Sequence, residues 1–429
     1  MTTTVTTTAQ TQAGPSGGTA KPRGAARAAQ GAEAGAGGDR LAVADELVRQ
    51  LGQTRTEPAA DAQLEALALA VAANLPVLLW GEPGIGKTAA LQQLAAGLDT
   101  ALETVIASVH EPSDFAGLPV VGDDPAVRGV PMAPPDWAVR LAERGRGVLF
   151  FDELSSAPPA VQAALLRVVL ERRVGSLALP ASVRVVAAAN PPSSAADGWH
   201  LSPPLANRFV HLRWTHDPRV VARGFAGTWP RIPVPAVRAE RMPSAVARAR
   251  GVISGFLTAR PGLIHRLPAD AEARGGAWPS PRTWEMALRL LAFGYAAQAG
   301  REALASALVG AVGDGPGVEL LSYVEELDLP DPDQVLADPA AFSLPERGDR
   351  QLAFLTAVVA AVQSSTTRQR WEAGWEVLAK AVDAGVPDVA ARAAYDLAAL
   401  RDTDWPVPAV VGAFVDVLQA SGLLTAAGR

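Results

Sequence analysis

Short apolar runs alternate with helix-like spacings along the first half of the chain. The runs at 76–80, 102–109, 148–151 and 183–189 predict strands, and helices are expected at 88–98, 135–144 and 158–173. The stretch 205–214 is expected to end a short helix and to start a further strand. The runs at 148–151 and 183–189 are continuously apolar, which suits strands buried on both faces of a sheet. The pattern therefore predicts an α/β fold built on an open parallel sheet.

Beyond residue 216 the spacing of apolar residues becomes helical throughout. Helices are expected at 244–259, after Ser280, and at 351–363, 370–384, 388–400 and 408–421, with an Asp/Pro-rich connection at 327–339. The first part of the chain, 1–39, has almost no large apolar residue and is expected to be a disordered tail, followed by helices near 41–51 and 64–71. We expect three ordered regions: an α/β domain at 40–216, a helical region at 217–328 and a C-terminal helical region at 329–429.

Composition narrows the class of protein. The 429 residues carry a net charge of −6, which argues against sequence-independent binding of nucleic acid. There is no cysteine, and the five histidines have no metal-ligand spacing, so we expect neither disulfides nor a structural metal. No apolar run reaches the roughly 20 residues that a membrane span requires, and no signal peptide is evident at the start. The expected location is the cytoplasm.

A phosphate-binding motif follows the first strand. The sequence GEPGIGKT fits the pattern G-x-x-x-x-G-K-[ST], in which glycines let backbone N–H groups turn toward a triphosphate. Lys87 supplies a positive charge for the β- and γ-phosphates, and the Thr88 hydroxyl is placed to bind Mg²⁺. The expected nucleotide-binding residues are Gly81, Glu82, Pro83, Gly84, Ile85, Gly86, Lys87, Thr88 and Ala89.

Two carboxylates end the strand at 148–151, at the edge where open parallel sheets bind ligands. Asp152 is positioned to hold Mg²⁺, and Glu153 to polarise the attacking water. Asn190 ends the strand at 183–189 and can hydrogen-bond a water and a phosphate oxygen. Arg208 is suited either to a neighbouring subunit's γ-phosphate or to a local salt bridge, and Arg282 to a phosphate contact or a surface charge.

The motifs GEPGIGKT, FFDEL, AAAN, LANRF and SPR, in this order, resemble those of AAA+ ATPases, in particular the MoxR-type branch related to magnesium chelatase and dynein-like motors. The resemblance implies an αβα nucleotide domain with an all-α lid, assembled as a ring, commonly a hexamer. It implies Walker A roles for Lys87 and Thr88 and Walker B roles for Asp152 and Glu153. Asn190 resembles sensor 1, Arg208 an arginine finger acting in trans and Arg282 sensor 2, acting in cis or in trans. Residues 113–119 and 172–180 are similar to an insert and a hairpin that project toward a pore or partner.

These expectations favour an ATP- and Mg²⁺-dependent ATPase that rearranges a protein partner. The resemblance implies that this partner carries a von Willebrand factor A domain, for which the C-terminal helices could be the docking platform or, equally, could pack as part of the lid. Two alternatives remain open from the sequence. One is a nucleic-acid motor of helicase type, which would bind DNA in a salt-dependent manner. The other is a nucleotide-switched scaffold whose ring state, without turnover, is the signal.

Overall fold

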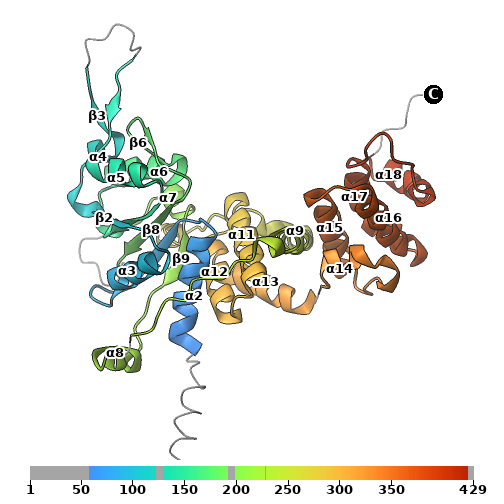
Figure 1. Cartoon of the computed structure of the whole chain (residues 1–429), viewed down its shortest axis with the longest axis horizontal. Coiled ribbons are helices and arrows are strands. Elements are labelled where there is room, and N and C mark those ends of the chain that lie inside the picture. Colours follow the sequence, from blue (N-terminus) through green and yellow to red (C-terminus); the bar gives the residue numbers. More distant parts are fainter. Residues whose placement is uncertain (1–57, 122–128, 192–198, 228, 328, 424–429) are drawn as a thin grey trace, which may run out of the picture. The chain divides into compact units, whose positions relative to one another are not determined.

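The structure is a computed structural model that describes residues 58–121, 129–191, 199–227, 229–327 and 329–423 (Figure 1). The tail expected at 1–39 and the helix expected near 41–51 lie outside the described residues. The first described element, α2 (Pro58–Ala72), confirms the helix expected before the phosphate-binding motif. Within the described residues, no helix is both long enough and apolar enough to cross a bilayer.

A five-stranded parallel sheet forms the centre of the first half of the chain. Its strands are β1 (Val77–Trp80), β2 (Leu102–Ile106), β5 (Gly147–Asp152), β8 (Val183–Ala189) and β9 (Val210–Arg213), in the order β2-β5-β8-β1-β9. The expected strands are confirmed, but β2 ends earlier than predicted, because residues 107–109 form a 3₁₀ turn. Since all the pairings are parallel, the carboxyl ends of the strands share one edge.

Helices cover both faces of this sheet. In β5, Val148 and Phe150 belong to one hydrophobic core, whereas Leu149 and Phe151 belong to another. The first core includes side chains of α2 and α3 (Lys87–Gly97), and the second includes those of α5 (Asp136–Arg144) and α6 (Pro159–Glu171). Both faces of β5 are therefore buried, as its continuous apolar run predicted, and the αβα class is confirmed.

The Pro/Gly-rich stretch before α5 is more ordered than its sequence suggests. It contains α4 (Pro112–Ala116) and a hairpin of β3 (Leu118–Pro119) and β4 (Met132–Ala133). The hairpin expected near 174–180 is present as β6 (Arg173–Val174) and β7 (Leu177–Ala178). Gly175 N–H donates to the Phe115 carbonyl at 3.2 Å, and a Cβ on Gly117 would meet Gly175 Cα at 2.8 Å. The two hairpins thus touch through glycine backbone.

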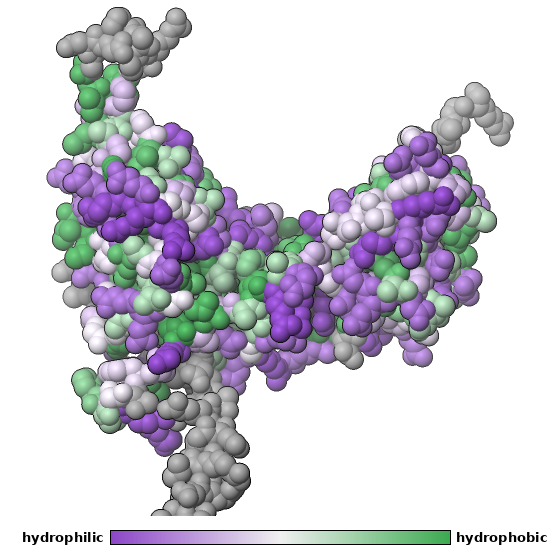
Figure 2. All heavy atoms as spheres, in the orientation of Figure 1, coloured by the Kyte–Doolittle hydropathy of each residue, from purple (hydrophilic) through white to green (hydrophobic). Residues whose placement is uncertain are grey.

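The β3–β4 hairpin exposes apolar side chains. Val121 is 84% exposed and Leu118 is 61% exposed. Figure 2 shows hydrophobic colour along this hairpin, next to the grey residues at its end. An exposed apolar hairpin of this kind is typical of a contact surface.

The second half of the described chain is helical. Its helices are α7 (Pro203–Ala206), α8 (Pro218–Phe225), α9 (Met242–Ala259), α10 (Ala271–Arg274), α11 (Pro281–Ala297), α12 (Arg301–Val312), α13 (Asp314–Leu327), α14 (Pro332–Ala337), α15 (Gly348–Ser364), α16 (Arg368–Asp383), α17 (Pro387–Ala398) and α18 (Val415–Ala420). Three of the expectations for this half need correction or extension. The connection at 327–339 contains α14, the helix expected at 408–421 is a 3₁₀ segment followed by α18, and α8, α10, α12 and α13 were not anticipated.

Helices from both sides of residue 328 share one core. α9 packs against α11 and α15, and a Cβ on Gly251 of α9 would meet the Ala353 carbonyl of α15 at 2.2 Å. This close backbone approach requires glycine. α12 in turn packs against α2 and β9, so the helical half contacts the sheet that carries the phosphate-binding motif.

Candidate nucleotide-binding site

The loop between β1 and α3 has the backbone of a phosphate cradle. Gly84 and Gly86 have φ angles of 79° and 88°, in the left-handed region that favours glycine. A Cβ on Gly81 would lie 2.6 Å from the Trp214 carbonyl, so a side chain does not fit there. Helix α3 begins at Lys87, which places the positive end of its dipole beside the loop. Glu82, Pro83 and Ala89 are exposed, whereas Ile85 is half-buried and packs on the core.

Lys87 is folded back into this loop. Its ammonium donates to the Gly81 carbonyl at 2.6 Å and to the Glu82 carbonyl at 2.9 Å. A third bond, at 3.3 Å, reaches Asn190 Oδ1 at the end of β8. Burial lowers the pKa of Lys87, and the nearby carboxylate of Asp152 partly opposes that shift. The structure thus brings Lys87 and Asn190 together, although 103 residues separate them.

The two carboxylates at the end of β5 point to different partners. Asp152 Oδ2 accepts from the Thr88 hydroxyl at 3.5 Å, which pairs a carboxylate and a hydroxyl oxygen of the kind Mg²⁺ prefers. No cluster of three or more His, Asp or Glu side chains occurs among the described residues, so a metal here would take its remaining ligands from phosphates and water. The donor set fits Mg²⁺ in a nucleotide complex.

Glu153 adopts an uncommon backbone conformation next to Asp152. Its φ of 54° lies in the left-handed region, and its N–H donates to Asp152 Oδ1 at 2.9 Å. The Glu153 carboxylate accepts from the Ser108 hydroxyl at 2.6 Å. Left-handed geometry at a residue other than glycine costs free energy and persists where surrounding contacts fix it, often at functional sites.

Ser108 was not identified from the sequence. It lies in the 3₁₀ turn 107–109 that follows β2, the strand beside β5. The prediction extended that strand to residue 109, which placed Ser108 inside the strand rather than at its end. A polar residue at the carboxyl end of β2 was the available signal, because this edge also carries Asp152 and Asn190.

Asn190 is fixed by its backbone as well as its side chain. Its N–H donates to the hydroxyl of the buried Ser155 at 3.1 Å, and Ser155 lies in the turn directly after Glu153. The Gly81 N–H donates to the Ala189 carbonyl at 3.1 Å. These bonds tie the end of β8 to both the phosphate loop and the carboxylate turn.

The two predicted arginines lie near each other, and Arg282 contacts Asn207, the residue before Arg208. The Asn207 side chain is 2% exposed, and its Oδ1 accepts from Arg282 Nη1 at 3.2 Å and from the Ser280 hydroxyl at 2.8 Å. Burial, and then the charge of Arg282, lower the pKa of Arg208. Arg208 donates to the Pro204 carbonyl, whereas its buried Nε has no hydrogen-bond partner among the described residues.

Neither arginine forms an ion pair with a carboxylate in the part of the chain that the structure describes. The local salt bridge considered for Arg208 is therefore not found there. Within the same residues, neither arginine hydrogen-bonds Lys87, Asp152, Glu153 or Asn190. The predicted site residues thus fall into two groups, one at the phosphate loop and one at Arg208 and Arg282.

A buried histidine joins two strands below the phosphate loop. His211 of β9 accepts from Trp80 Nε1 at 2.8 Å, and its Nε2 lies 2.9 Å from the Ala206 carbonyl, to which it can donate only as the neutral Nε2–H tautomer. Complete burial lowers the pKa of His211 to about 4, although the Ala206 contact opposes the shift. Trp80 is the residue before Gly81, so this pair anchors the start of the loop.

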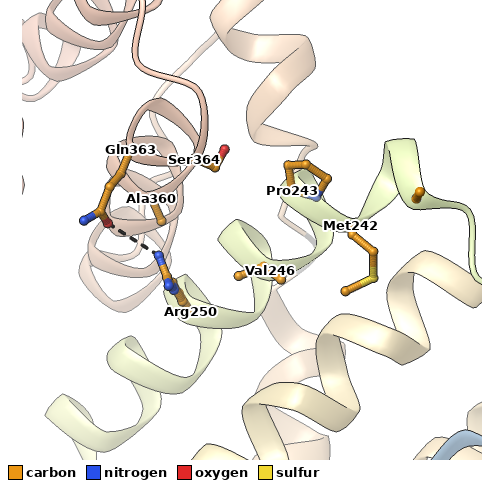
Figure 3. Close-up of a pocket in the computed structure, with 8 residues that line it drawn as sticks. Met242, Pro243, Val246, Arg250, Ala360, Gln363 and Ser364 are labelled. Atoms are coloured by element: carbon orange, nitrogen blue, oxygen red, sulfur yellow. Dashed lines mark hydrogen bonds between the residues drawn. The ribbon is translucent and has the colours of Figure 1, made fainter. Parts of the chain in front are cut away.

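A separate hollow of about 510 Å³ lies between α9 and α15 (Figure 3). Its lining includes Met242, Val246 and Ala360, and Arg250 donates to Gln363 across it at 3.4 Å. It contains none of the predicted site residues. The hollow is therefore separate from the nucleotide site predicted at the phosphate loop.

The strand order, the loop after β1 and the carboxylates after β5 define an AAA+ domain of the P-loop ATPase class. Residues 76–209 match the family model for the AAA domain of the dynein-related subfamily. Protein MoxR of Methylorubrum extorquens is 37% identical over 117 residues, which cover 27% of this chain and 33% of MoxR. Residues 76–209 thus match an AAA domain, part of the chain is similar to MoxR, and this match spans about a third of that relative.

Two solved structures resemble the chain. A candidate ATPase from Cytophaga hutchinsonii is 18% identical, with a TM-score of 0.36 over 61% of this chain and 79% of that one. NtrX from Brucella abortus, in complex with ADP, is also 18% identical, with a TM-score of 0.26 over 82% of this chain and 74% of that one. Both TM-scores are low, so the assignment rests on the topology, the motifs and the family match.

Replacing Ser108 by Ala is expected to lower kcat for ATP hydrolysis by roughly ten- to a hundredfold, because the Glu153 carboxylate loses the bond that positions it. The KM for ATP should change little, since the Ser108 side chain makes no hydrogen bond to the phosphate loop among the described residues. Steady-state phosphate release measures both constants. Ser108→Thr, which keeps the hydroxyl, is the matched control and should retain activity. An unchanged kcat in Ser108→Ala would show that the bond is not needed.

The stability of the fold should fall as pH drops from about 6.5 to about 4. His211 stays neutral in the folded chain down to its pKa of about 4, whereas the unfolded chain binds the proton near 6.5. The difference corresponds to roughly 3 kcal/mol that is present above pH 6.5 and lost on acidification. Urea unfolding of the natural chain and of His211→Gln, at about pH 7 and about pH 4.5, isolates the contribution of His211 to the free energy of unfolding. Equal pH dependence in both chains would contradict the assignment.

Proposed function

We propose that the chain is a Mg²⁺-dependent ATPase of MoxR type that uses ATP hydrolysis to rearrange a protein partner. The observation that supports this most strongly is the pair Ser108–Glu153 at 2.6 Å, because it holds a carboxylate at the sheet edge beside the phosphate loop. A nucleotide-switched scaffold without turnover has no need of a positioned base. The arrangement therefore favours hydrolysis.

Each side chain at the loop has a distinct role in this proposal. The loop N–H groups and Lys87 bind the phosphates, for which Lys87 exchanges its present carbonyl contacts. Thr88 and Asp152 would hold Mg²⁺, which neutralises phosphate charge when bound. Glu153 accepts a proton from the attacking water, and Asn190 orients that water or a phosphate oxygen.

The proposed assembly is a ring, of hexameric type, in which each site lies between two subunits. Arg208 and Arg282 lie near each other, lack a carboxylate partner among the described residues and make no contact there with their own phosphate loop. Two guanidinium groups without counter-charge suit a triphosphate supplied by the neighbouring subunit. We therefore assign both arginines to action in trans.

The proposed partner carries a von Willebrand factor A domain, as the MoxR-type motifs imply. The chain's net charge of −6 disfavours a nucleic-acid track. The β3–β4 hairpin, which touches the β6–β7 hairpin through Gly117 and Gly175, offers an exposed apolar surface for protein contact. Hydrolysis at the sheet edge is the energy source for the rearrangement.

Replacing Glu153 by Gln should preserve ATP binding while lowering turnover by at least about 100-fold, because the amide keeps the shape but cannot accept the proton. Fluorescent-nucleotide titration measures binding, and phosphate release measures turnover. Glu143→Gln, on the exposed side of α5, is the matched control and should behave as the natural chain. Undiminished hydrolysis in Glu153→Gln would remove Glu153 as the base.

The same variant examines the partner. With ATP bound and unhydrolysed, Glu153→Gln should retain its protein partner longer than the natural chain does. Affinity isolation with ATP, compared with isolation by Lys87→Ala, which loses a phosphate contact, should enrich a protein with a von Willebrand factor A domain. ATP-dependent enrichment of nucleic acid instead would favour a motor.

A further inference from the structure

Three arginines meet at the opposite edge of the sheet from the phosphate loop. Arg172 ends helix α6, Arg184 is the second residue of β8, and Arg289 lies in α11. Arg184 and Asn190 are six residues apart along an extended strand, or roughly 20 Å. The cluster is therefore distinct from the nucleotide site at the carboxyl end of β8.

Asn74, which lies just after α2, accepts a hydrogen bond from the first of these arginines. Arg172 Nη2 donates to Asn74 Oδ1 at 3.3 Å, and its Nη1 donates to the Val183 carbonyl at 2.5 Å. Asn74 and Arg172 both have left-handed backbones, with φ of 55° and 53°. Each follows the end of a helix, where a left-handed residue is a common cap, so the two helix ends place Asn74 and Arg172 side by side.

The other two arginines converge on the same backbone. Arg289 Nη2 donates to the Ala73 carbonyl and, at 3.4 Å, to that of Asn74. Arg184 Nη1 donates to the Ala181 carbonyl at 3.3 Å, which also accepts from Asn74 Nδ2 at 2.9 Å. A guanidinium has five N–H donors, so these bonds leave several donors free on Arg184 and Arg289.

The cluster has no opposing charge among the described residues. None of the three arginines forms an ion pair there. Their positive charges repel one another. Burial, then the charges of Arg184 and Arg289, lower the pKa of Arg172 to about 10, and burial and Arg289 lower that of Arg184. The acceptors are neutral carbonyl oxygens, so this positive charge is uncompensated in a chain whose net charge is −6.

We propose that Arg172, Arg184 and Arg289 form a second anion-binding site, which takes a compact phosphoryl-bearing polyanion such as pyrophosphate or the phosphate chain of a nucleotide. The tetrahedral oxygens of such a group accept from several guanidinium forks at once. A lone carboxylate accepts from one fork and leaves the remaining charges unpaired. The convergence of three arginines therefore favours the phosphoryl class.

Such a ligand would bridge the sheet and the helical half of the chain. Arg172 and Arg184 belong to the nucleotide-binding domain, whereas Arg289 lies on α11, whose first turn carries Arg282. Occupancy would hold α11 against the sheet and so fix the position of Arg282. This regulatory consequence rests on the proposed ATPase function, but the binding itself does not.

The test is calorimetric titration of the full chain with pyrophosphate, in metal-free buffer, while a fluorescent ADP analogue fills the phosphate loop and reports any displacement. The natural chain should bind pyrophosphate without losing the analogue. Arg172→Gln and Arg184→Gln should each weaken that binding at least tenfold. Arg173→Gln is the matched control, because Arg173 is adjacent in sequence but donates to the Ser176 carbonyl of its own hairpin, and it should bind as the natural chain does.

Several outcomes would overturn the proposal. These are no binding by the natural chain, equal binding by all four chains, or tighter binding of tricarballylate, which would make the site one for carboxylates. The ligand-free Tm supplies a second measurement. Because Arg184 has only a local carbonyl contact, Arg184→Gln should keep or raise the Tm by relieving repulsion. A lowered Tm without any change in pyrophosphate binding would show that the cluster stabilises the fold and does not bind the anion.

Discussion

The parallel pairing of the central strands determines where the chemistry lies. Because β1 runs between β8 and β9, and β5 pairs with β8 in the same direction, the residues that follow these strands meet at one edge. Lys87, Asp152 and Asn190 come from separate parts of the sequence and yet lie within hydrogen-bond reach of one loop. The central strands β5 and β8 are buried on both faces, so their apolar side chains fix where these strands lie in the sheet.

The same pairing explains how much the sequence reveals. Apolar runs locate the strands, and the polar residue after each run is then a candidate, which is how Asp152, Glu153 and Asn190 were found. Ser108 escaped because the apolar run of β2 continues into a 3₁₀ turn, where the backbone leaves the strand without a compositional signal. Helix α14 escaped because its proline lies at the first helical position, where proline begins a helix as readily as it breaks one.

Long-range charge arrangements were beyond sequence reasoning for a different reason. The approach of Arg282 to Arg208 depends on how α11 packs, and Arg282 contacts Asn207, a buried residue that had no apparent role in the sequence. The cluster of Arg172, Arg184 and Arg289 draws on three elements and on Asn74, none of which forms a motif. In both places, positive charges gather without carboxylates among the described residues, although acidic residues outnumber basic ones in the chain. Such charge points to anions supplied from outside the chain.

The central claim is that a neighbouring subunit completes each nucleotide site. Mixing an Arg208→Ala chain with a Lys87→Ala chain tests it most directly, because we expect neither to hydrolyse ATP alone. In mixed assemblies, verified by native mass spectrometry, an intact Lys87 on one chain can meet an intact Arg208 on the next. The account predicts ATPase activity well above the sum of the two separate chains. Verified mixed assemblies with no recovered activity would contradict it.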